Sequence, residues 1–187
     1  MLLDIALGIL VAVFLDIFFE LNFFVVLFFS IVFSLLPDLD FIIYKILGIH
    51  EDKGYKHRDL FHSPLLYLPI GTILIYLTFG KIIAIAFLII STLHFLHDSI
   101  ACGRGIKWLY PFSQNSYAFI YEYSRIRRKG IWKPVFIFDE KYLKYFDKKH
   151  GDENWIENIY KSWHPIAIIE TGVFVISIFI LLIYLYL

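Results

Sequence analysis

Aspartate and histidine side chains occur at metal-ligand spacing in three short segments of this sequence, each beside an apolar run. The first segment, "LLPDLD" at 35–40, places Asp38 and Asp40 two residues apart. Where the backbone after the proline is extended, both carboxylates reach one cation. The same residues also suit the end of a helix at a membrane interface, capped by acids.

The second segment, "HRDLFHS" at 57–63, offers His57 and His62 as ligands, and Arg58 is available to pair with a carboxylate or a phosphate. The alternative is a plain interfacial loop. In that interpretation Ser63 is the N-cap of a helix whose first residue is Pro64.

The third segment is "LHFLHD" at 93–98. His94 and Asp98 stand at positions i and i+4, which lie on one face of a helix and allow two side chains to bind one metal ion. A hydrogen-bonded core histidine is the alternative for His94 alone. The carboxylate partner at the same depth favours a site.

The elements that must position these residues are membrane helices. The 187 residues are 59% hydrophobic and 20% aromatic with a mean hydropathy of +0.70, which is far too apolar for an ordinary soluble domain. We therefore expect an all-α, polytopic membrane protein with about five transmembrane helices and a cytoplasmic insert. The expected helices cover 3–19, 22–36, 64–79, 82–101 and 165–187, with a tight turn near Glu20–Asn22.

The basic residues predict the orientation. Threading the chain through five spans puts four Lys and Arg residues in the 37–63 loop and twelve in the 102–164 insert on one side, and leaves Lys81 on the other. The positive-inside rule makes the basic side cytoplasmic. The predicted site then faces the cytoplasm from a multi-pass protein of the inner membrane.

Two further acids belong to this side. Glu170 lies inside the last predicted span, where an isolated buried carboxylate would protonate, so that a retained charge implies a cation partner. The alternative is a protonated glutamic acid hydrogen-bonded between helices. Asp4, near the start of the first span, is either a ligand or a helix N-terminal acid.

The chain divides into a membrane-embedded core of four spans at 1–113, an insert at 114–164 and a final transmembrane helix at 165–187. In the insert, "IWKPVFIFDEKYLKYFDKKH" at 131–150 alternates aromatic and charged residues. This pattern suits a short hairpin followed by an amphipathic helix at the membrane surface. "RIRRK" at 125–129 suits contact with anionic headgroups or a solvated charge run.

The order "LLPDLD", "HRxxxHS", "HxxxD" and "GIKWLYPFS" resembles the YdjM-like family of membrane-bound metal-dependent hydrolases over residues 4–113. The resemblance implies metal-ligand or active-site roles for Asp38, Asp40, His57, His62, His94 and Asp98. It also implies that Gly105 and the residues around Pro111 shape the mouth of the site. The chain departs from the family pattern in two places: Asp4 stands where members usually carry a histidine, and HRGxTHS is replaced by HRDLFHS.

This resemblance, with a more distant link to all-helical zinc phospholipases and single-strand-specific nucleases, implies two or three divalent ions, Zn²⁺ or Mn²⁺. They would bind a phosphoester and activate a water, with Asp98 and Arg58 as catalytic residues. The expected partners are the bilayer and a small-molecule or lipid substrate, and the balanced charge predicts no nucleic acid. A divalent-cation carrier or sensor is the competing function, although no internal repeat supports it.

Overall fold

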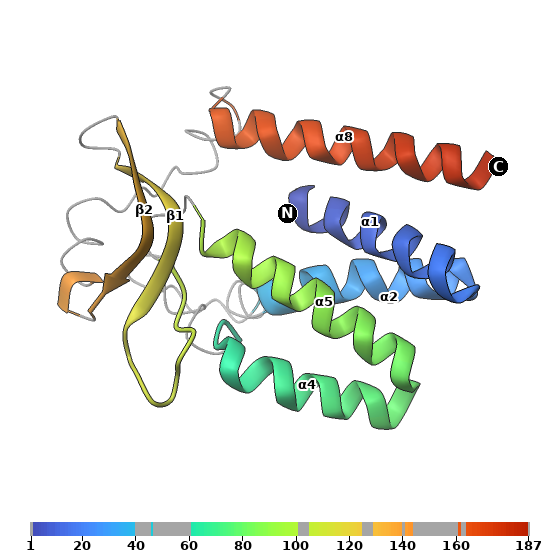
Figure 1. Ribbon diagram of the computed structural model, residues 1–187, viewed down its shortest axis with the longest axis horizontal. Coiled ribbons are helices and arrows are strands. Elements are labelled where there is room, and N and C mark those ends of the chain that lie inside the picture. Colours follow the sequence, from blue (N-terminus) through green and yellow to red (C-terminus); the bar gives the residue numbers. More distant parts are fainter. Residues whose placement is uncertain are drawn as a thin grey trace. The chain divides into compact units, whose positions relative to one another are not determined.

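The computed structural model describes residues 2–39, 46, 61–100, 105–124, 129–139, 141–143, 161 and 164–186. Most of these residues are helical (Figure 1). All five predicted apolar stretches are helices, and their ends lie within three residues of the predicted ones. Within the chain, a polar residue, glycine or proline borders each of these apolar runs. The helices are α1 (Leu2–Phe19), α2 (Phe23–Leu35) with the 3₁₀ turn η1 (Leu36–Asp38), α4 (Pro64–Phe79), α5 (Lys81–Asp98) and α8 (Pro165–Tyr186).

Three of the helices are long and apolar enough to cross a membrane: α1 and α5, with 18 residues each, and α8, with 22. Helix α2 has 13 residues and α4 has 16. At a rise of about 1.5 Å per residue they measure about 20 and 24 Å, less than a hydrocarbon core of about 30 Å. Three candidate spans are therefore established, and the number five stays a prediction.

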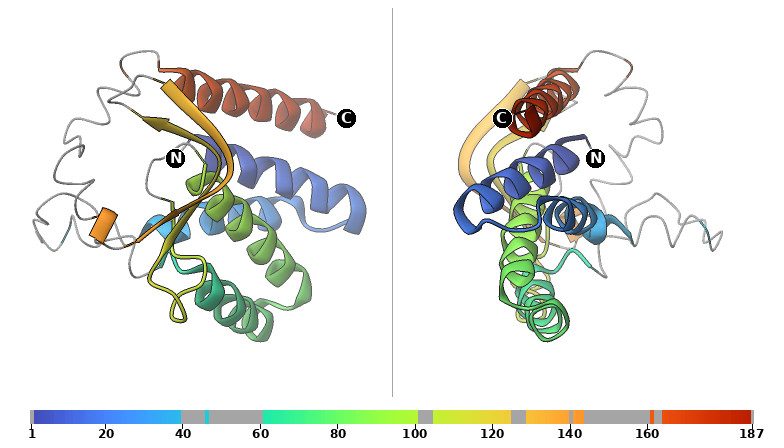
Figure 2. Two further views of the ribbon diagram at one scale, coloured as in Figure 1. Left: turned by 60° about the vertical axis from the view of Figure 1, so that its left-hand side comes forward. Right: turned by 90° about the vertical axis from the view of Figure 1, so that its right-hand side faces the viewer.

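The expectation of an all-α fold is wrong in one respect, because the insert contains an antiparallel pair of strands. They are β1 (Ser116–Ser124) and β2 (Lys129–Phe138), which lie side by side in both views of Figure 2. The second strand overlaps the segment 131–150 that was predicted to hold a hairpin, but its partner strand precedes that segment. Residues 141–143 are helical, and the rest of the predicted amphipathic helix lies outside the described residues.

The chain forms two compact units. The first comprises Met1–Pro37, Gly71–Ser91 and Asn154–Leu187, and the second comprises Asp38–Ile70 and Thr92–Glu153. The division of the chain at 113 and 164 made from the sequence is not tested by these units and stays a prediction.

In the first unit, α1 packs against both α2 and α8. A Cβ on Gly8 would lie 3.0 Å from the carbonyl oxygen of Ser30, so glycine lets the backbones of α1 and α2 approach closely. The predicted turn at 20–22 is confirmed, and the Asn22 side chain accepts a hydrogen bond from the backbone of Val25. Asp16 accepts hydrogen bonds from Leu21 N (2.8 Å) and from the Tyr184 hydroxyl. These bonds fasten the end of α8 to the α1–α2 turn.

In the second unit, the hairpin is bonded directly to the residue that follows α5. Phe119 N donates to the Ser99 carbonyl oxygen (2.7 Å), and the Trp108 indole donates to the Ser99 hydroxyl (2.8 Å). Ile106 exchanges two backbone hydrogen bonds with Tyr117, 2.8 and 3.1 Å long. On one face of the hairpin the buried side chains of Ala118, Phe136 and Phe138 pack together.

Candidate metal centre

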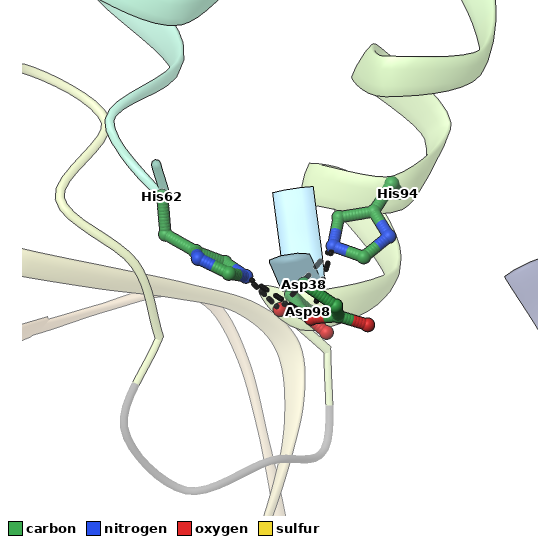
Figure 3. Close-up of side chains that lie close together, drawn as sticks. All are labelled: Asp38, His62, His94 and Asp98. Carbon is green, nitrogen blue, oxygen red and sulfur yellow. Dashed lines mark ion pairs between the residues drawn. The ribbon is translucent and has the colours of Figure 1, made fainter. Parts of the chain in front are cut away.

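Four of the predicted ligands come together in the second unit, although they come from three separate stretches of the chain. Asp38 ends η1, His62 stands two residues before α4, and His94 and Asp98 lie on the last turns of α5. One ligand atom from each lies within 4.8 Å of all the others. Figure 3 shows both imidazoles directed at the two carboxylates.

The distances between the ligand atoms approach a metal-binding geometry. His62 Nε2 lies 3.2 Å from Asp98 Oδ2 and 3.5 Å from Asp38 Oδ1, and His94 Nε2 lies 3.8 Å from each of the same oxygens. Tetrahedral zinc with bonds of about 2.0 Å separates its ligands by about 3.3 Å. Other pairs in the set lie up to 4.8 Å apart, so the nitrogens and oxygens would have to close by up to about 1.5 Å to bind one Zn²⁺ ion. The same donor types also suit Mn²⁺.

Three of the four side chains in the His/Asp cluster are buried, so the charge of the carboxylates needs compensation. The side chains of His62 and His94 are each 1% exposed, and that of Asp98 is 11% exposed. Carboxylates are costly to bury without compensating positive charge, which a bound cation or protonated histidines would supply. The Asp38 side chain is 34% exposed, so solvent reaches the cluster from the side of Asp38.

Phe95 packs edge-on against both imidazoles of the cluster. It is fully buried, and its ring centroid lies 6.1 Å from that of His62 and 5.8 Å from that of His94. Tyr67 on α4 packs edge-on against Phe95, with ring centroids 5.4 Å apart. Contact with the Phe95 ring restricts the rotamers of His62 and His94. This supporting role of Phe95 was not predicted from the sequence.

Two further supporting residues, Ser99 and Trp108, were not predicted. Ser99 directly follows Asp98 and is hydrogen-bonded to Trp108. The Ser99 hydroxyl donates to the Phe95 carbonyl oxygen (2.7 Å) and accepts from the Trp108 indole. The Trp108 ring in turn packs against Phe119 of β1, with centroids 5.6 Å apart. The sequence did show Trp108, inside the motif "GIKWLYPFS". Its hydrogen-bond partner Ser99 lies nine residues earlier, and local spacing does not predict that pairing.

Gly105 has a structural reason to be glycine. Its φ is +60°, and a Cβ there would lie 2.2 Å from the Tyr117 carbonyl oxygen. The backbone can thus pass close to β1 and place Ile106 beside Tyr117. A role of Gly105 in shaping the mouth of the site stays a prediction.

The remaining predicted residues divide into two groups. Asp40, His57 and Arg58 lie outside the described residues. Asp4 on α1 and Glu170 on α8 belong to the first unit and are 2% and 4% exposed. The role of Asp4 and Glu170 as metal ligands stays a prediction.

Ser63 occupies the predicted position but does not make the predicted bond. Pro64 is the first residue of α4, and the Ser63 carbonyl oxygen accepts hydrogen bonds from Leu66 N and Tyr67 N. The Ser63 hydroxyl, although 3% exposed, makes no hydrogen bond to any residue that the structure describes. The capping role assigned to this side chain is therefore wrong.

Replacing Ser63 with alanine should consequently leave stability almost unchanged. Removing a buried hydroxyl without a partner is near neutral or stabilising, whereas loss of a true N-cap costs about 1 kcal/mol. We expect the thermal midpoint in detergent to move by less than about 2 °C. A fall of about 4 °C or more would show that the hydroxyl does cap α4.

A chain of apolar helices whose described part holds one buried His/Asp cluster defines an integral membrane protein with a candidate metal centre. Residues 2–186 match the family model described as YdjM inner membrane protein, and the chain belongs to this family. The resemblance seen in the motifs is thereby confirmed over nearly the whole chain. The family description names the inner membrane and no activity. Neither a curated protein nor a solved structure matches the chain.

Proposed function

We propose that this protein is a membrane-embedded, metal-dependent hydrolase that acts on a phosphoester, either a lipid or a smaller molecule. The observation that supports the proposal is the convergence of two buried imidazole nitrogens on two carboxylate oxygens at 3.2–3.8 Å. Three of these side chains, those of His62, His94 and Asp98, would hold a divalent ion and leave its remaining position open toward Asp38, the most exposed of the four. Catalytic metal sites differ from structural ones in having such an open position.

Each residue has a distinct task in this proposal. His62 and His94 bind the metal through Nε2, and Asp98 binds beside them from the same helical face as His94. A divalent ion held by these residues would supply Lewis acidity for a phosphoryl oxygen and for a water molecule. Asp38, the most exposed of the four, accepts the proton that the attacking water releases. Arg58, from the "HRDLFHS" segment, neutralises the phosphoester.

The test combines metal analysis with a substrate panel. Protein purified in detergent is treated with a chelator, reloaded with Zn²⁺ or Mn²⁺, and assayed against a phosphodiester, a phospholipid and a peptide. We expect hydrolysis of a phosphoester that is lost with the metal and restored by reloading. Metal flux into proteoliposomes without hydrolysis of any of the three substrates would favour the cation carrier instead.

We also propose that the site faces the cytoplasm, since sixteen of the 17 Lys and Arg residues fall on one side of the five-span topology. Reporter fusions after Lys148 and after Leu187 should report opposite compartments, the first cytoplasmic. If both fusions reported the same compartment, the chain after Lys148 would not cross the membrane once, and the five-span topology would be wrong.

A further inference from the structure

Trp108 contacts the same phenylalanine ring that contacts both histidines of the candidate metal centre. Its ring centroid lies 6.5 Å from that of Phe95, with the ring planes 74° apart. The Phe95 ring in turn meets the imidazoles of His62 and His94 edge-on, at 6.1 and 5.8 Å. These separations fall within the range of about 4.5–7 Å over which aromatic pairs attract. A single ring therefore connects Trp108 to both imidazoles.

A chain of two hydrogen bonds gives Trp108 a second connection to Phe95. The indole Nε1 donates to the Ser99 hydroxyl (2.8 Å), and this hydroxyl donates to the Phe95 carbonyl oxygen (2.7 Å). Ser99 is fully buried. A hydroxyl has one proton, so a donor that occupies its oxygen leaves that proton for the carbonyl. Both the ring and the backbone of Phe95 are thus held from the position of Trp108.

The hairpin holds Trp108 in its turn. Phe119 of β1 packs against the indole, with ring centroids 5.6 Å apart. The backbone N–H of Trp108 donates to the Ile106 carbonyl oxygen (3.0 Å), and Ile106 exchanges two backbone hydrogen bonds with Tyr117 of the same strand. The indole ring, its N–H and the backbone N–H are all engaged, so Trp108 is a rigid support.

Neither metal binding nor attachment of the hairpin accounts for these contacts. The indole nitrogen is a donor only, so Trp108 cannot itself bind a metal ion. The hairpin is already bonded to the residue after α5, because Phe119 N donates to the Ser99 carbonyl oxygen. The double connection to Phe95 instead supports the ring that contacts both candidate ligands.

We propose that Trp108 is a positioning residue of the metal centre, which sets the orientation of the His62 and His94 rings through Phe95. The proposal rests on the metal centre of the proposed function and requires no particular substrate. Residues that orient metal ligands without touching the ion change metal affinity by about 10- to 100-fold. Because Trp108 acts through an intervening residue, we expect an effect at the lower end, about tenfold.

The test measures metal affinity in the full chain, purified in detergent, with Co²⁺ as the probe. The visible absorption of bound Co²⁺ depends on the geometry of its ligands. Trp108→Phe keeps an aromatic ring and removes the indole N–H. The dissociation constant for Co²⁺ should rise about tenfold, and the absorption of the bound ion should change. Trp132→Phe, the same substitution at an exposed position of β2, is the matched control and should change neither.

Ser99→Ala tests the hydrogen-bonded route and replaces the first variant if that one does not fold. Both substitutions remove the same bond, so the double variant should bind Co²⁺ no more weakly than the weaker single variant. Losses that multiply in the double variant would overturn the proposal. Unchanged affinity and absorption in Trp108→Phe, even with a lower thermal midpoint, would show that Trp108 only supports the fold. Failure of the unmodified chain to bind Co²⁺ would instead refute the metal centre, and this proposal with it.

Discussion

Replacing Asp98 with alanine is expected to lower the metal affinity of the purified protein by at least about 100-fold. Mutating a residue that only orients a metal ligand already lowers metal affinity by about 10- to 100-fold. Asp98 is itself one of the four candidate ligands, so its loss should cost more. It lies nearest to His62, at 3.2 Å, and its side chain is only 11% exposed, so neither water nor a neighbouring carboxylate replaces it easily. Metal content after dialysis, measured by elemental analysis, checks this outcome.

The matched control for Asp98→Ala is Asp16→Ala. Asp16 also stands on an apolar helix and makes two hydrogen bonds, but it lies outside the His/Asp cluster. This variant should lose stability through the Tyr184 bond and keep its metal. Equal metal content in the Asp98 variant and the unmodified protein would contradict a metal centre at this cluster. It would leave the four side chains as a network of ion pairs.

The second large effect is expected at Gly105. An alanine there adopts a left-handed φ of +60°, which costs about 1–2 kcal/mol, and its Cβ would meet the backbone oxygen of Tyr117 at 2.2 Å. Because the obstacle is backbone, the 105–106 segment must move and the paired hydrogen bonds of Ile106 and Tyr117 must break. Amide hydrogen exchange at these two residues should accelerate by at least about 100-fold, which corresponds to roughly 2.7 kcal/mol.

Gly172 provides the control for this substitution, since it lies inside α8 and a Cβ there meets nothing within 4 Å. Alanine is a better helix former than glycine by about 1 kcal/mol, so Gly172→Ala should be neutral or stabilising. Unchanged exchange at Ile106 in Gly105→Ala would show that the 105–106 segment tolerates a side chain.

The parts of this fold that are determined by residues close together in the chain were predictable from the sequence. Runs such as 64–79 and 165–187 specify helices over nearly their full length, because long apolar stretches with at most one charged residue satisfy their backbone groups within the helix. The pairing of β1 with β2 was not predictable, because register depends on contacts between residues far apart in the chain, such as Ser116 and Phe138.

The same distinction applies to the candidate site. His94 and Asp98 could be paired in advance, since helix geometry alone brings positions i and i+4 together. The approach of Asp38 and His62 to them depends on how three segments pack, and the motifs indicated only that these residue types suit a common ion. The support from Phe95, Ser99 and Trp108 was not foreseen, because aromatic and hydroxyl side chains carry no spacing that distinguishes a supporting role from ordinary packing.

Asp98 and Ser99 are neighbours in the chain, yet one belongs to the metal centre and the other carries the hairpin through Phe119 and Trp108. A change in the last turn of α5 would therefore affect both the candidate metal centre and the attachment of the hairpin. If metal binding changes the strength with which Ser99 holds the hairpin, thermodynamic reciprocity requires that the hairpin contacts change the metal affinity by the same factor.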